Sequence, residues 1–228
     1  MMKDIYDYGK LISENEFKAI IIKEIYFNNL VSFVNEIEVS DRVPFARYYC
    51  DRKKLCFNFD AILRNTLIKA SKHSFNSKKE KIMYLNCNII SVIFHEIAHV
   101  CQKKEENPLI ILSEQTESEL KIHNLYDVNL YLVNPIERQA NILSLSKIVC
   151  DTCPKNTHIN DVFKKQLIKI IKYGYDETFP IYIFFKDSNN FEDALYFSSS
   201  SLCEFDEKLE YGSELTYDEY KKIKELKL

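Results

Sequence analysis

One stretch of the sequence, residues 78–103, constrains the fold more than any other because it has the pattern of a long buried helix. Ser77 and Glu80 form a capping box, the Ser-x-x-Glu arrangement that often opens a helix. Between Ile89 and Val100 nearly every position is apolar. The polar exceptions are Ser91, His95, Glu96 and His99. A helix that is apolar on nearly every side is buried, so the rest of the chain must cover this one.

The segments before this helix predict one further long helix, a β-hairpin and a short helix. A second capping box begins at Ser13 and precedes an apolar-rich run, which predicts an N-terminal helix over residues 14–37. Two aromatic-rich segments within residues 46–59 flank a polar turn, which is typical of a hairpin. Asp60 is then predicted to cap a helix over residues 61–72.

The segments after it are predicted to be mainly helical. Asn134–Pro135 is a good cap and first-turn pair and predicts a helix that ends near Cys150. An amphipathic helix is predicted over residues 162–173, and a third capping box at Thr216 opens a last one. The expected fold class is therefore α+β and mostly helical, with a short hairpin or small sheet packed beside the helix at 78–103.

Length and composition bound the domain organisation and the partners. The 228 residues suit a single domain over residues 1–228, with its core at about 44–150 and a helical extension at 155–228. A net charge of -3 provides no basic field to attract nucleic acid. Without a signal-peptide pattern or an apolar run long enough to span a bilayer, no membrane association and a cytoplasmic location are expected. Seven cysteines in that setting predict reduced thiols rather than a disulfide framework.

The pattern His-Glu-Ile-Ala-His at residues 95–99 predicts a metal site on the buried helix. Residues four apart lie on one helix face with β-carbons roughly 6 Å apart, so His95 and His99 can bind one ion. Zinc suits two imidazole ligands, and Glu96 beside them is the expected general base. The alternative is that two core histidines and a paired glutamate match the pattern by chance. Burying a carboxylate beside two imidazoles without a partner costs several kcal/mol, which favours a cation.

A catalytic zinc site needs a third protein ligand, for which Glu137 is the favoured candidate. It lies in the first turn of the helix after Asn134–Pro135, and Asn141 follows one turn later, where it can hydrogen-bond a ligand histidine. A glutamate favoured there only by the helix dipole is the alternative. His123 and His158 remain candidates for a three-histidine site. Three other downstream carboxylates are expected to be solvated: Glu114, Glu117 and Glu119.

These motifs resemble those of the gluzincins, zinc metallopeptidases with His-Glu-x-x-His and a downstream Glu ligand followed four residues later by an acid or amide. The matching residues here are 95–99, Glu137 and Asn141. The order of hairpin, helix and active-site helix is similar to that of the minimal bacterial and phage-borne zincins, including the ImmA/IrrE-like group. The resemblance covers roughly residues 44–150 and implies a minimal zincin-like domain.

The expected function is that of a zinc metallopeptidase with one zinc ion, a peptide or protein substrate and Glu96 as general base. One alternative is a regulatory or interaction module that keeps a structural metal without turnover, and another is a hydrolase of a non-peptide bond. A structural zinc site at Cys150 and Cys153 is a weaker possibility, since a lone Cys-x-x-Cys is unspecific. Several residues could stabilise an oxyanion, with none preferred: His123, Tyr131, His158, Tyr173 and Tyr175.

Overall fold

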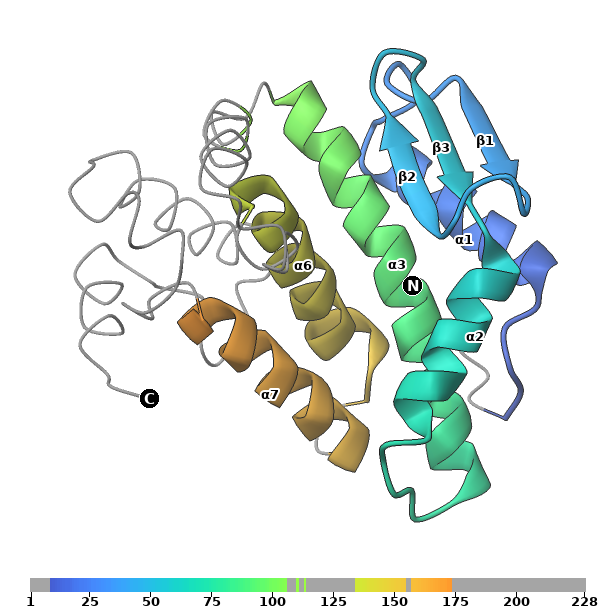
Figure 1. Cartoon of the computed structure of the whole chain (residues 1–228), viewed down its shortest axis with the longest axis vertical. Helices are drawn as coiled ribbons and strands as arrows, with labels where there is room; N and C mark the ends of the chain where they lie inside the picture. The colour runs from blue at the N-terminus through green and yellow to red at the C-terminus, as the bar shows by residue number, and fades with distance from the viewer. Residues whose placement is uncertain (1–8, 106–109, 111–112, 114–133, 155–156, 174–228) are drawn as a thin grey trace, which may run out of the picture. The chain divides into compact units, whose positions relative to one another are not determined.

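The computed structural model describes residues 9–105, 110, 113, 134–154 and 157–173 (Figure 1). Within them the fold is α+β, mostly helical with one small mixed sheet, as predicted for the fold class. The chain divides into two compact units, Met1–Glu105 with Lys147–Asp161 and Glu106–Ser146 with Val162–Leu228. The prediction of a single domain over residues 1–228 stays a prediction.

Helix α1 (Glu14–Phe27) begins at the predicted capping box but ends ten residues before the predicted limit of residue 37. Ser13 accepts a hydrogen bond from the Glu16 amide, and the Glu16 side chain accepts one from the Ser13 amide. At the other end Asn28 is the C-cap, and Asn29 has a φ of 53°, the left-handed conformation that ends many helices. The predicted range 14–37 is therefore wrong at its C-terminal end.

The sheet contains the predicted hairpin and one strand that was not predicted. Strands β2 (Ala46–Tyr49) and β3 (Lys54–Phe57) pair antiparallel across a turn in which Lys53 has a φ of 49°. Strand β1 (Glu36–Val39) pairs parallel with β3, so the strand order is β1-β3-β2. Residues 36 and 37, which were assigned to the N-terminal helix, thus begin a strand.

Helix α2 (Phe59–Ala70) begins before the predicted cap at Asp60, which instead lies in its first turn. The N-cap is Asn58, whose side-chain oxygen accepts from the Ala61 amide at 3.0 Å. Its amide nitrogen donates to the Val43 carbonyl at 2.8 Å. Asn58 therefore satisfies two backbone groups, whereas an aspartate could only accept. The assignment of the cap to Asp60 is wrong, because α2 begins at Phe59 and Asp60 lies inside its first turn.

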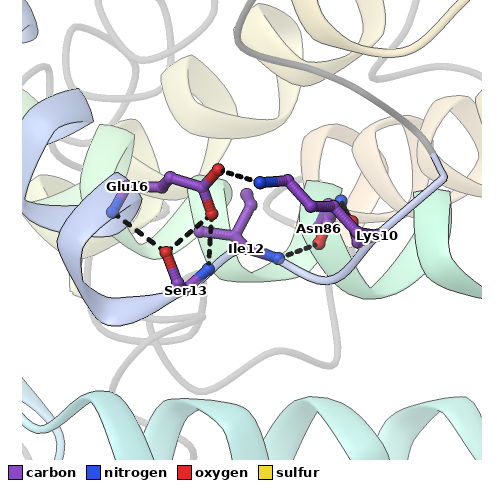
Figure 2. Close-up of polar contacts among 5 residues, drawn as sticks. All are labelled: Lys10, Ile12, Ser13, Glu16 and Asn86. Carbon is purple, nitrogen blue, oxygen red and sulfur yellow. Dashed lines mark hydrogen bonds and ion pairs between the residues drawn. The ribbon is translucent and has the colours of Figure 1, made fainter.

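Helix α3 (Lys78–Lys104) confirms the long buried helix, with Ser77 as its N-cap. Helices α1 and α2 and strand β2 pack against α3. Figure 1 shows α3 running beside the edge of the sheet that β2 forms. Two hydrogen bonds also join α3 to the N-terminal segment. Asn86 accepts from the Ile12 amide at 3.0 Å and donates to the Lys10 carbonyl at 2.9 Å (Figure 2).

The core of this unit is formed by aromatic and branched aliphatic side chains from the helices and β3. Phe17 of α1 meets Phe57 edge to face, with ring centroids 5.4 Å apart, and its ring lies 5.2 Å from that of Phe59. The α3 residues Ile89, Ile90 and Ile93 are fully buried. Helix α3 is therefore held in place on several sides, which fixes the direction in which its polar side chains project.

Helix α6 (Pro135–Lys147) confirms the helix predicted after Asn134–Pro135, and a π-helical segment, η2 (Ile148–Thr152), follows it directly. The side-chain oxygen of Asn134 accepts from the Ile136 amide at 3.0 Å. Helix α7 (His158–Tyr173) begins four residues earlier than predicted.

The other predictions for the C-terminal extension at 155–228, including the helix after Thr216, lie outside the described residues. No helix in the described part of the chain combines the length and hydropathy that a membrane span requires.

Candidate metal centre

The two histidines of the motif project from successive turns of α3 toward a common point. The Nε2 atoms of His95 and His99 lie 3.1 Å apart, and the two rings meet edge to face with centroids 4.7 Å apart. Both side chains are half-buried, on a helix whose neighbouring residues Phe94, Ile97 and Val100 are buried. The spacing of four residues thus brings the two ring nitrogens together, as the sequence predicts.

This separation fits a shared cation. Two imidazole nitrogens that each lie about 2.0–2.1 Å from one tetrahedral zinc ion are about 3.3 Å apart. The 3.1 Å between the Nε2 atoms of His95 and His99 is close to that value. Two neutral rings can also approach through an N–H···N hydrogen bond, so this distance favours a cation only together with a nearby carboxylate.

Glu96 is the first of these carboxylates. Successive residues of an α-helix are about 100° apart around the axis, so Glu96 projects beside the face that carries His95 and His99. It is 6% exposed, so its side chain is buried on this helix. A buried carboxylate therefore lies one residue after His95 on the same helix.

Glu137 is the second carboxylate. It lies in the first turn of α6, where its amide donates to the Asn134 side chain at 3.4 Å. One ligand atom from each of His95, His99 and Glu137 lies within 4.8 Å of the other two, so the three could hold a metal ion. Two neutral imidazoles and one carboxylate are a donor set that zinc accepts.

One other ligand candidate from the sequence, His158, lies within the described residues and is not part of this group. His158 is exposed at the first position of α7. His123 and the carboxylates Glu114, Glu117 and Glu119 lie outside the described residues. The same is true of the oxyanion candidates Tyr131 and Tyr175, and the side chain of Tyr173 is not described.

The Cys-x-x-Cys pair contributes to no second metal group in the described part of the chain. Cys153 is buried and hydrogen-bonded to the thiol of Cys87, and this bond, with burial, raises the pKa of Cys87 well above its ordinary value. The Thr157 hydroxyl lies 3.7 Å from the Cys153 sulfur. The hydrogen bond with Cys87 lowers the pKa of Cys153. Cys153 is thus paired with a core thiol, Cys87, rather than grouped with other metal-binding side chains in the described residues.

Gln102 contacts the site and was missed in the sequence. Its side-chain oxygen lies 2.8 Å from Nδ1 of His99, and Gln102 is 2% exposed. The spacing of seven residues from His95 to Gln102 could have indicated this contact, because positions i, i+4 and i+7 share one helix face. The role of holding a ligand histidine was predicted for Asn141, and it stays a prediction.

A buried ion pair between Lys147 and Glu24 packs against α3 next to the motif. The Lys147 ammonium is 5.1 Å from the ring centroid of Phe94, the residue before His95, and 3.7 Å from a carboxylate oxygen of Glu24. Burial raises the pKa of Glu24, and the positive charge of Lys147 opposes that shift. This pair therefore supports the position of α3 rather than supplying a ligand.

Comparisons of the chain with protein-family models, with curated proteins and with solved structures find no match. What the site can do is therefore argued from its own residues.

Proposed function

We propose that the chain is a zinc-dependent hydrolase that cleaves peptide bonds, with His95, His99 and Glu137 as ligands of one zinc ion. The observation that carries the proposal is the approach of two imidazole nitrogens to 3.1 Å beside the buried carboxylate of Glu96. Glu137 adds a carboxylate oxygen to the possible ligand atoms, and two imidazoles with one carboxylate suit a divalent cation. The proposal also includes the gluzincin-like character that the sequence motifs indicate.

Each residue has a distinct role in this proposal. Zinc bound by three protein ligands keeps a fourth position open, lowers the pKa of a water molecule to about 7 and polarises a carbonyl group. His95, His99 and Glu137 would hold the cation. Glu96 accepts the proton of the attacking water and then passes it to the departing amine, the usual work of a general base that becomes a general acid.

The sheet favours a peptide over other substrates. Strand β2 is an edge of the described three-stranded sheet and packs against α3, the helix that carries the histidines. An edge strand has unpaired backbone groups that an extended peptide can pair with, which is a recurrent mode of peptide binding. A peptide bound there would run close to the helix that holds Glu96.

Zinc affinity and hydrolysis, measured separately on the same variants, test the proposal. Glu96→Gln should keep wild-type zinc affinity and lower the cleavage rate of an unstructured peptide mixture, followed by mass spectrometry, by about 10²–10⁴-fold. His99→Ala and Glu137→Ala should lower zinc affinity in competition with a chromophoric chelator. Glu105→Gln is the matched control, because Glu105 is an exposed glutamate at the end of the same helix.

Three results would contradict parts of the proposal. Full activity of Glu96→Gln would remove Glu96 as the base. Unchanged zinc affinity in Glu137→Ala would assign the third ligand to another residue. A wild-type protein that binds zinc but cleaves no peptide would favour the regulatory module with a structural metal.

A further inference from the structure

The hydrogen bond between Gln102 and His99 has a defined donor and a defined acceptor. Helical side chains lean toward the N-terminus of their helix, so Gln102 reaches back over the turn that carries His99. The Gln102 side-chain oxygen and Nδ1 of His99 are 2.8 Å apart, a normal hydrogen-bond length. A carboxamide oxygen can only accept, so Nδ1 of His99 is the donor and carries the hydrogen.

This hydrogen bond decides which ring nitrogen of His99 can bind a cation. A neutral imidazole carries one hydrogen, so a hydrogen on Nδ1 leaves a lone pair on Nε2. Nε2 is the atom that lies 3.1 Å from Nε2 of His95. The lone pair of His99 therefore faces the position that the two histidines share.

We propose that Gln102 is a positioning residue that holds His99 in the Nδ1-protonated tautomer and so presents Nε2 to the cation. The inference rests on the proposed function, because it assigns His99 as a metal ligand. His95, His99 and Gln102 all lie on α3, so one helix supplies two ligands and the group that orients one of them. Hydrogen-bond partners of this kind also raise the basicity of the ligand nitrogen.

Zinc affinity of two variants of Gln102 gives the first test. Gln102→Met has nearly the same volume but no acceptor, and it should bind zinc about 10–100-fold more weakly. Gln102→Glu restores an acceptor of the same length and should bind zinc at least as tightly as the wild type. The matched control is Asn88→Leu, which removes another buried amide of α3, one that donates to the Tyr84 carbonyl at 2.9 Å. It should leave zinc affinity unchanged.

The tautomer of His99 in the metal-free protein gives a second test, which does not depend on zinc or on cleavage. The ¹⁵N shifts of the imidazole nitrogens should show the Nδ1–H form in the wild type and in Gln102→Glu, and a shift toward Nε2–H in Gln102→Met. A wild-type ring in the Nε2–H form, or wild-type zinc affinity in Gln102→Met, would overturn the role of Gln102 and leave the hydrolase proposal standing. Absence of zinc binding by the wild type would instead overturn the hydrolase proposal.

Discussion

Replacing Lys147 with methionine tests how a buried charge pair supports helix α3. The side chains of Lys147 and Glu24 are 8% and 1% exposed, and the ammonium lies 3.7 Å from one Glu24 oxygen. It also lies 3.4 Å from a carboxylate oxygen of Asp151 and 5.1 Å from the ring centroid of Phe94. Methionine keeps the apolar part of these contacts and removes the charge.

The cost of this change follows from what remains around Glu24. Its Oε2 accepts from the Asn28 side chain at 3.3 Å, and its Oε1 has no hydrogen-bond partner among the described residues. A buried carboxylate without its cation takes up a proton instead of staying charged. From an ordinary pKa of 4.5, protonation at pH 7 costs about 3.4 kcal/mol, at 1.36 kcal/mol per pH unit. Lys147→Met should therefore lower the free energy of unfolding by about 3 kcal/mol at pH 7, in the range known for broken buried pairs.

The penalty should depend on pH with a definite sign. Burial raises the pKa of Glu24, and removal of Lys147 removes the charge that opposes the shift. A carboxyl group whose pKa is higher in the folded than in the unfolded state stabilises the fold less as the pH rises between the two values. The destabilisation by Lys147→Met should thus be smallest near pH 4.5 and grow toward pH 7.

Urea unfolding of the wild type and the variant between pH 4.5 and pH 8 measures this difference. The double variant Lys147→Met with Glu24→Gln lacks the Glu24 carboxylate and should lose this pH dependence. Lys18→Met is the matched control, because Lys18 forms an exposed pair with Glu14 on α1, and such pairs contribute about 0.3–0.5 kcal/mol. A penalty for Lys147→Met that is the same at every pH would refute the reasoning.

Two further predictions concern the helix caps. Asn58→Ala should lower the free energy of unfolding by about 1–2 kcal/mol, because the α2 cap is lost. Asp60→Ala should lower it much less. Similar losses for the two variants in urea unfolding would contradict the assignment of Asn58 as the cap. The hydrogen bond from Lys10 lowers the pKa of Glu16 to about 2, so Glu16 stabilises the fold above pH 4.5 and loses this effect as the pH falls toward 2. The stability difference between the wild type and Glu16→Gln should shrink over that range, and a difference that grows on acidification would exclude the cause given.

The helix starts were predictable because the signals for them are local. Ser13, Ser77 and Asn134 each accept hydrogen bonds from amides two or three residues ahead, and each was identified from a few letters of sequence. The end of α1 also had a local signal in Asn28–Asn29, which an apolar run continuing to Phe33 obscured. Its left-handed residue is visible only in the structure.

The first strand was not predictable in the same way. Residues 36–39, Glu-Ile-Glu-Val, form a strand by pairing with Lys54–Phe57, and the hydrogen bonds that hold them come from a segment about 18 residues away. The ion pairs of Lys54 with Glu36 and Glu38 reinforce that register. Because β propensity depends on the neighbouring strand, a four-residue segment shows little of its structure by itself.

The candidate metal centre also combines residues placed by local helix geometry with a residue placed by long-range packing. His95, His99 and Gln102 take their arrangement from helical spacing on α3, so a sequence that forms this helix also places them. Because α3 is packed on several sides, little side-chain freedom remains to be lost when the two imidazoles bind a cation. Glu137 comes from a separate helix, and no periodicity relates it to the histidines. Under the proposed function, replacing Gln102 should therefore change the orientation of a ligand histidine, whereas replacing Glu137 should remove a ligand, and both changes should lower the zinc affinity.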